Sequence, residues 1–163
     1  IMNKNLVTIL NKTLINMNHT ISEIEIKYSP ATNKQDRIKI TCSQDAYRTF
    51  LSNWNHDTIE LQEEFKVMLL NKTNEVIGVS ILSKGGMSSC IVDLKLLFAL
   101  VLKSASPVII LAHNHPSGNL KPSEADKRLY EKVKKGAEYL DIQVLDNMII
   151  TKDDFYSFAD RGL

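Results

Sequence analysis

Hydrophobic positions after residue 59 predict β-strands in five segments. Residues 60–70 and 76–82 are rich in apolar residues and flank the turn-forming sequence NKTNE, so they predict a hairpin. The sequence PVIILA at 107–112 is continuously apolar, which is typical of a strand that is covered on both faces. Residues 142–151 predict a further strand, and we expect residues 155–158 to pair with it. The pattern therefore predicts a sheet with a buried centre.

Two segments between these strands have the spacing of helices. Residues 94–104 predict a buried helix that Asp93 caps. Residues 122–140 place Leu129 and Val133 at helical spacing and carry charges on the opposite face. Strands and helices that alternate in this way predict an α/β fold: a mixed β-sheet flanked by helices, in which at least part of the sheet is parallel.

The first third of the chain has a less regular pattern. It predicts, in order, a helix or two short strands at 4–20, strands at 21–29 and 37–41, and a helix that Ser43 caps and that runs to about Trp54. The polar sequence SNWNHDT that follows has the composition of a connection. We therefore expect a short N-terminal α+β extension at 1–58 and the main domain at 59–163.

Charge and composition narrow the kinds of partner. The 163 residues carry a net charge of about +1, so the chain has no global basic field that would support DNA binding. The first twenty residues lack the long apolar run of a signal peptide, and the longest apolar stretch is too short to span a membrane. Two widely spaced cysteines without a C-x-x-C pattern suit a reducing compartment. We expect a cytoplasmic protein without a membrane segment, and the sequence predicts no particular oligomeric state.

The sequence HNHPSGNLKPSEAD, residues 113–126, contains two histidines, serines and an aspartate, which are candidates for a metal site. His113 and His115 follow the apolar strand, at the strand end where open α/β sheets place their ligands. Residues i and i+2 of an extended segment point the same way, so the two imidazoles aim at one point. Asp126, in the first turn of the next helix, can bring a carboxylate to the same point. Two histidines, one aspartate and an open position match a catalytic zinc site.

The same residues also fit a purely structural interpretation. Ser123 and Asp126 have the spacing of a capping box before the helix. His113 and His115 can be solvated polar residues of a loop. The capping role of Ser123 and a metal-binding role of Asp126 are compatible with each other, so both interpretations stay open at this point.

The spacing H-x-H, seven residues, S-x-x-D resembles the core signature of the JAMM/MPN+ (JAB) metalloproteases, and in particular the bacterial RadC-like branch. The blocks QEEFKVMLLN, VIGVSILSKGG, VIILAHNHPSGNLKPSEAD and LDIQVLDNMII carry this resemblance, which covers about residues 60–163. It implies a cytidine-deaminase-like JAB/JAMM fold that binds Zn²⁺ through His113, His115 and Asp126, with Ser123 helping to hold an oxyanion. The chain departs from the family at Asn147, where a histidine is usual, and it lacks a recognisable helix-hairpin-helix region.

The resemblance also implies an upstream glutamate that acts as the catalytic base. The candidates are Glu60, Glu63, Glu64 and Glu75. Strand alternation places Glu63 on the more apolar face with Phe65 and puts Glu64 on the other face. We expect the more apolar face to be the core side, where a buried base would lie, so Glu63 is the predicted base. The resemblance places the family glutamate at Glu63 as well. The structural alternative is a solvated charge at the start of a strand.

These observations predict a zinc-dependent metallohydrolase of the RadC-like JAMM type that cleaves a peptide or isopeptide bond in a peptide or protein substrate. One alternative is a DNA-binding factor associated with repair or recombination, which affinity for branched DNA would distinguish. Another is a non-catalytic interaction module, which would be stabilised by metal but would lack hydrolytic activity.

Overall fold

The computed structural model describes residues 36–86 and 90–163, so the elements predicted at 4–20 and 21–29 lie outside it. Its strands are β1 (Glu64–Leu70), β2 (Val76–Lys84), β3 (Val108–Asn114), β4 (Gln143–Ile150) and β5 (Phe155–Ser157). Its helices are α2 (Ser43–Ser52), α3 (Leu94–Lys103) and α4 (Glu124–Glu138), followed near the end by the 3₁₀ turn η2 (Ala159–Arg161). No helix in these two ranges is long and apolar enough to cross a membrane.

The strands form one mixed sheet in the order β2-β1-β3-β4-β5. β3 and β4 are parallel, and the other neighbouring strands are antiparallel. The predicted mixed sheet flanked by helices is therefore confirmed, as is the pairing of β5 with β4. The predicted cap of α3 is also confirmed, because the Asp93 carboxylate accepts a hydrogen bond from the Lys95 N–H group at 2.8 Å.

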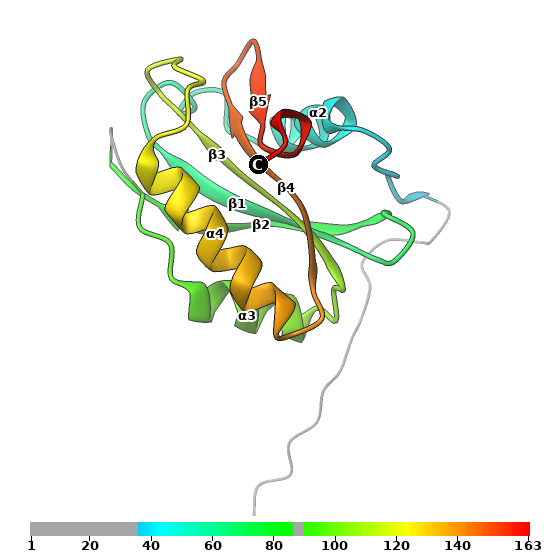
Figure 1. The fold of residues 1–163 in the computed structure, drawn as a ribbon. Coiled ribbons are helices and arrows are strands. Elements are labelled where there is room, and N and C mark those ends of the chain that lie inside the picture. Colours follow the sequence, from blue (N-terminus) through cyan, green and yellow to red (C-terminus); the bar gives the residue numbers. More distant parts are fainter. Residues whose placement is uncertain (1–35, 87–89) are drawn as a thin grey trace, which may run out of the picture.

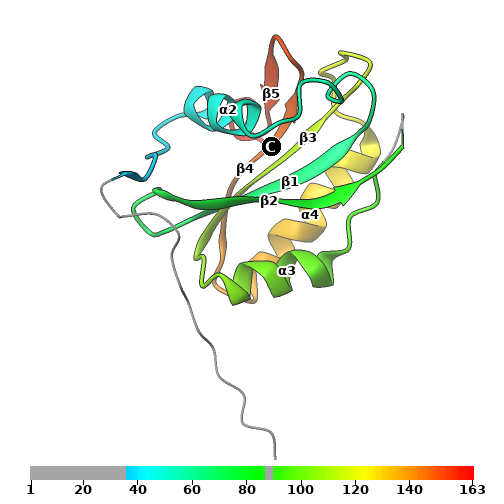
Figure 2. The same ribbon diagram turned by 180° about the vertical axis from the view of Figure 1, so that it is seen from behind.

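Helices cover both faces of the sheet. α3 and α4 lie side by side on one face and α2 lies on the other (Figures 1 and 2). The two helices on the first face come close at Gly136, where a Cβ atom would lie 2.7 Å from the ring of Phe98. Two of the three clusters of buried hydrophobic residues in the described ranges accordingly lie on opposite faces of β1 and β3. Consecutive residues of these strands therefore face different environments.

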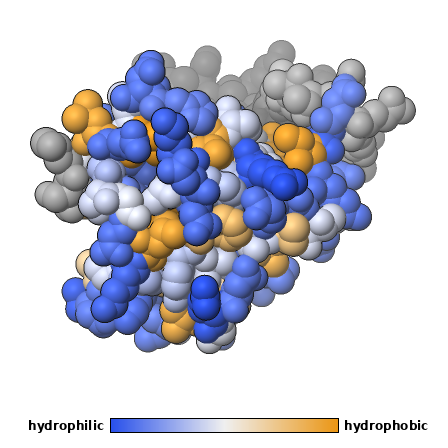
Figure 3. Space-filling model, turned by 90° about the horizontal axis from the view of Figure 1, so that it is seen from above, coloured by the Kyte–Doolittle hydropathy of each residue, from blue (hydrophilic) through white to orange (hydrophobic). Residues whose placement is uncertain are grey.

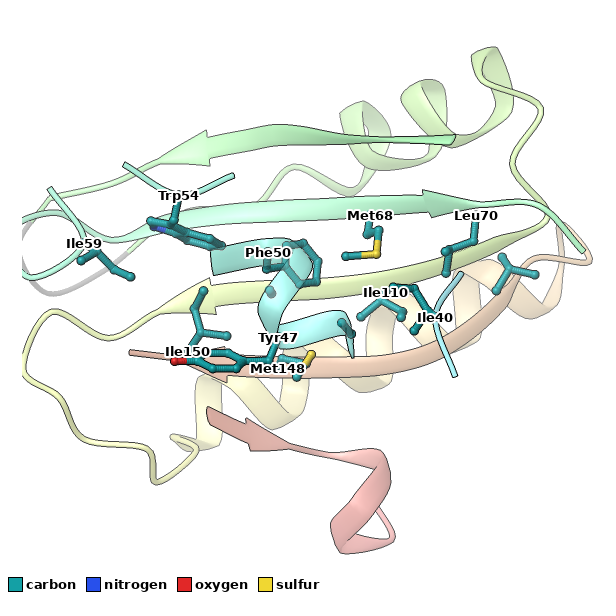
Figure 4. Packing of buried hydrophobic residues seen from close by; sticks show 13 residues of the cluster. Ile40, Tyr47, Phe50, Trp54, Ile59, Met68, Leu70, Ile110, Met148 and Ile150 are labelled. Atoms are coloured by element: carbon teal, nitrogen blue, oxygen red, sulfur yellow. The ribbon is translucent and has the colours of Figure 1, made fainter. Parts of the chain in front are cut away.

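The N-terminal helix α2 shares a hydrophobic cluster with the sheet. Tyr47, Phe50 and Trp54 pack against the face of the sheet that carries Met68 and Met148 (Figure 4). The predicted boundary after residue 58 stays a prediction, but the described residues before it are packed on the main sheet.

Three local predictions were wrong. Ser43 does not cap α2; the N-cap is Cys42, and the Ser43 hydroxyl donates instead to the Asp160 carboxylate at 2.6 Å. The predicted strand at 37–41 is reduced to a single bridge between Lys39 and Glu75. The strand predicted from residue 60 starts at Glu64, because turns occupy the residues before it.

Candidate metal centre

The two histidines lie at the carboxyl end of β3. His113 is the penultimate residue of this strand and is buried, and His115 follows directly after the strand ends. Beyond them the chain turns away at Pro116 and Gly118, and Gly118 has a φ of 75°, a conformation that glycine adopts without strain. The Nε2 atoms of the two imidazoles lie 3.1 Å apart, so the H-x-H spacing aims both rings at one point, as the sequence predicts.

Asp126 reaches the same point from the first turn of α4. Its Oδ1 atom lies 3.3 Å from the Nε2 atom of His113, and its Oδ2 atom lies 3.8 Å from the Nε2 atom of His115. Ser123 is the N-cap of this helix, and together with Asp126 it forms the predicted capping box. The cap and the convergence of Asp126 with the histidines are therefore present together.

The spacing of these atoms fits a zinc ion. Ligand atoms at zinc–nitrogen and zinc–oxygen bond lengths in a tetrahedron lie roughly 3.3 Å from one another. The two Nε2 atoms lie 3.1 Å apart, and Oδ1 of Asp126 lies 3.3 Å from that of His113. With one ligand atom taken from each of the three residues, all three atoms lie within 4.8 Å of one another. Two imidazoles and one carboxylate are also the donors of many catalytic zinc sites. The group can therefore hold a metal and leave one coordination position open.

Neighbouring groups hold two of the three ligands in place. The Nδ1 atom of His115 lies 2.5 Å from the carbonyl oxygen of Asn119. A proton on that nitrogen leaves the Nε2 lone pair free for a metal. The Ser123 N–H group and hydroxyl both donate to Oδ2 of Asp126 at 2.6 Å, so Oδ1 remains directed at His113.

The charge of Asp126 is favoured by the same contacts. Burial by itself raises the pKa of this carboxyl. The hydrogen bond and charge of His113, together with the two hydrogen bonds from Ser123, outweigh burial and hold the pKa well below its usual range. Asp126 is therefore ionised near pH 7, and the ionised carboxylate is the form that binds metals.

A cavity of about 370 Å³ adjoins the convergent ligands. It is lined by Glu63, Cys90, His115, Pro116, Ser117, Asn119, Lys121, Ser123, Ala125 and Asp126. The face of the molecule that carries the loop after β3 is mostly hydrophilic, with separate hydrophobic residues among the polar ones (Figure 3). The cavity brings Glu63 and Ser123 to the same space as the ligand group.

The two neighbouring glutamates face opposite ways. Glu63 is half-buried, directly precedes β1 and lines this cavity. Glu64 is 1% exposed and lies on the other face of the sheet, where its carboxylate is 2.8 Å from Lys84 Nζ and 3.4 Å from Lys66 Nζ. Of the other two candidates, Glu60 is exposed and does not line this cavity, and Glu75 lies in the turn before β2. The two glutamates thus face opposite ways, as strand alternation predicts. The premise that only the Glu63 face is the core side was wrong, because both faces of β1 are covered and Glu64 is the more buried of the two.

The sequence did not single out several residues of this cavity. Cys90, Asn119 and Lys121 belong to no motif that the spacing of residues could reveal. Asn119 contacts His115 through its backbone carbonyl, and a backbone contact leaves no signal in residue type. His56, which also belongs to no motif, is exposed on a loop.

Comparison with known proteins gives consistent matches. The family model described as RadC-like JAB domain matches residues 40–163. A UPF0758 protein of Flavobacterium johnsoniae is 44% identical over 128 residues, which are 77% of this chain and 53% of the relative. A UPF0758 protein of Porphyromonas gingivalis is 41% identical over 135 residues, which are 82% of this chain and 58% of the relative. The chain thus spans a little over half the length of these relatives.

Proposed function

Because the chain belongs to the RadC-like JAB domain family, we propose that it is a zinc-dependent hydrolase that cleaves a peptide or isopeptide bond. One observation carries the proposal: His113, His115 and Asp126 converge beside a cavity that Glu63 also lines. A metal site and a carboxylate on one open cavity are the parts that metal-assisted hydrolysis requires.

His113, His115 and Asp126 would hold the zinc ion. When bound, zinc would polarise the scissile carbonyl and lower the pKa of the attacking water. The hydrogen bonds that Asp126 receives from Ser123 and that His115 makes to the Asn119 carbonyl fix the direction of these two ligands. Such supporting contacts raise the affinity of a metal site and keep its geometry constant.

Glu63 is the proposed general base. Its carboxylate would accept a proton from the attacking water and deliver it to the nitrogen of the leaving amine. Its backbone is fixed for this task by two hydrogen bonds to the chain after β2: Glu63 N–H donates to the Gly86 carbonyl at 2.9 Å, and Gly85 N–H donates to the Glu63 carbonyl at 2.8 Å.

Ser123 is proposed to stabilise the developing oxyanion. In the structure its hydroxyl proton is directed at Oδ2 of Asp126. A hydroxyl has one proton to donate, so it would have to rotate away from Asp126 to serve the oxyanion. The cap would survive this rotation in part, because the Ser123 N–H group would still bind Asp126.

A peptide or protein is the proposed substrate, and the cytoplasm is the proposed compartment. Both cysteines, Cys42 and Cys90, are free thiols, and free thiols suit a reducing compartment.

The test combines metal analysis with an unbiased search for substrate. Protein purified without added metal should contain close to one zinc per chain, and His115→Ala should lose most of it. Zinc-loaded protein is then incubated with a peptide pool and with isopeptide-linked conjugates, and products are identified by mass spectrometry. Wild type should cleave a defined subset, and Glu63→Gln should not. A folded, zinc-loaded wild type without any product would contradict the hydrolase and favour a binding module, and equal cleavage by Glu63→Gln would reveal a contaminating protease.

A further inference from the structure

The two ligand histidines differ at the ring nitrogen that would not bind the metal. In His115 this nitrogen, Nδ1, contacts the Asn119 carbonyl. In His113 the Nδ1 atom is buried and has no hydrogen-bond partner among the described residues. Histidines that bind metals through Nε2 almost always donate Nδ1–H to an acceptor, which fixes both the tautomer and the direction of the ring. The buried Nδ1 of His113 therefore calls for an acceptor.

The place of the His113 ring limits where that acceptor can lie. The ring is nearly parallel to that of Phe65 on β1, with 10° between their planes, and the Nε2 atom lies 3.3 Å from Asp126 beyond the strand end. Nδ1 is bonded to Cγ and therefore lies nearer to the strand than Nε2 does. An acceptor for Nδ1 has to come from the layer of side chains that surrounds His113 on this face of the sheet.

Asn147 lies in that layer. β3 and β4 are parallel, and Leu111 pairs with Asn147 while His113 pairs with Ile149. Asn147 and His113 therefore project from the same face of adjacent strands, two positions apart. Asn147 is 2% exposed, and its Oδ1 atom is buried without a hydrogen-bond partner among the described residues. A buried donor without an acceptor thus lies diagonally opposite a buried acceptor without a donor.

Another buried asparagine shows that this fold can satisfy such a group. Asn114 is fully buried at the end of β3. Its Oδ1 atom accepts from the Glu64 N–H group at 2.7 Å, and its Nδ2 atom donates to the carbonyls of Ile59 and Gln62 at 2.6 and 2.9 Å. Asn114 is a structural asparagine with every partner inside the protein, and Asn147 differs from it in this respect.

We propose that Asn147 is a positioning residue for the metal ligand His113, whose Nδ1–H group it receives through one buried water molecule. Neighbouring strands lie about 4.8 Å apart and two residues of a strand span about 6.6 Å, so the two backbones lie roughly 8 Å apart at these positions, a distance that the two side chains and one water span. The contact holds the proton on Nδ1 and so keeps the Nε2 lone pair directed at Asp126 and His115. The inference rests on the proposed zinc site and adds a residue that supports it from the interior of the sheet.

The first test measures zinc affinity by competition with a chromophoric chelator. Asn147→Leu keeps the size of the side chain and removes the acceptor, so zinc affinity should fall about 10–100-fold. Asn147→Asp keeps an acceptor and should bind zinc as tightly as wild type or more tightly. Met148→Leu is the matched control, because Met148 is the next residue of β4, is fully buried and lies on the other face. It should leave zinc affinity unchanged.

A second measurement requires zinc but no activity. In ¹H–¹⁵N spectra of the zinc-loaded protein, the Nδ1–H proton of His113 should be shifted downfield by its hydrogen bond in wild type, and it should move upfield in Asn147→Leu. The proposal is overturned if Asn147→Leu binds zinc within twofold of wild type, or if Asn147→Leu and Met148→Leu lose affinity equally. If Asn147→Leu does not fold, wild type and Asn147→Asp carry the test, and a His113 Nδ1–H proton of zinc-loaded wild type without the downfield shift of a hydrogen bond overturns it. Absence of hydrolysis would contradict the proposed function and leave these readouts intact.

Discussion

Strand β1 begins and strand β3 ends at the same edge of the sheet, but the two faces of the sheet differ there. On the face covered by α3 and α4, Glu63, His113 and the helix residue Asp126 lie at or beside an open cavity. On the face covered by α2, the next residue of each strand is Glu64 or Asn114, and both are buried. Glu63 and Glu64 therefore lie on opposite faces of the sheet, and so do His113 and Asn114.

We call the face covered by α2 the closed face and the face covered by α3 and α4, with its cavity, the open face. On the closed face, buried polar groups contact one another. Lys66 is 3% exposed, donates to the Asn53 carbonyl at 2.7 Å, lies over the ring of Trp54 and faces the Glu64 carboxylate. Burial lowers the pKa of this lysine, and the charge of Glu64 opposes that effect. The open face instead directs Nε2 atoms and a carboxylate at a common point beside a cavity. Burial of charge alone therefore does not mark the functional site; the convergence of ligand atoms beside a cavity does.

The largest expected effect separates the two glutamates. Glu63→Gln should lower kcat/KM on a cleaved peptide by about 10²–10⁴-fold with little change in stability, because the general base is lost. Glu64→Gln should lower the free energy of unfolding by about 3 kcal/mol, because it leaves Lys66 buried without its carboxylate. Peptide kinetics and urea denaturation measure the two effects. An unstable Glu63→Gln with a stable, inactive Glu64→Gln would reverse the comparison.

Metal removal should affect the open face alone. Zinc at about 100 times its dissociation constant should raise the free energy of unfolding by about 2.7 kcal/mol. We expect this gain in wild type and in His56→Ala, whose histidine is exposed on a loop, but not in His115→Ala. Thermal unfolding with and without chelator measures it. An equal gain in His115→Ala would place the zinc elsewhere.

Asn114 tests the closed face at the strand end itself. Asn114→Leu removes three hydrogen bonds to the backbone and leaves the Glu64 N–H group without an acceptor. We expect a loss of about 2 kcal/mol in the free energy of unfolding. Zinc affinity, measured on protein that is still folded, should not change. A fall in affinity as large as that of Asn147→Leu would mean that the two faces are not independent.

The smallest effect concerns the helix cap. Ser123→Ala should cost about 1 kcal/mol of stability, whereas Ser123→Thr should stay within a few tenths of wild type because it keeps the hydroxyl. Aspartate is not a neutral replacement here, because the Ser123 hydroxyl lies 2.6 Å from the Asp126 carboxylate. Urea denaturation of the metal-free protein measures the series. A Ser123→Ala variant as stable as wild type would show that the backbone contact to Asp126 is a sufficient cap.

The parts of the site that the sequence predicted depend on local geometry. H-x-H at a strand end and S-x-x-D at a helix start each fix the direction of their side chains within a few residues, so the approach of His113, His115 and Asp126 was predictable. Alternation along β1 likewise separated Glu63 from Glu64, even though the strand begins four residues later than predicted.

The parts that the sequence missed depend on contacts between distant segments. Ser43 donates to Asp160, 117 positions away, and no local signal distinguishes this bond from a helix cap. The predicted strand at 37–41 is reduced to one bridge, because Lys39 is the residue of this segment that pairs, and it pairs with Glu75, just before β2. The alternating pattern of the segment itself does not reveal this. The layer shared by Asn147 and His113 follows from the register of β3 and β4, which the sequence alone does not specify.

The capping box at Ser123 and Asp126 makes the start of α4 and the ligand group one cooperative unit. The same carboxylate closes the first turn of the helix through Oδ2 and faces His113 through Oδ1. Ion uptake and helix nucleation are therefore thermodynamically linked at this residue. Removal of zinc by a chelator would make the first turn of α4 less stable. The amide groups of this turn would then exchange hydrogen faster, so their exchange rate would report whether zinc is bound.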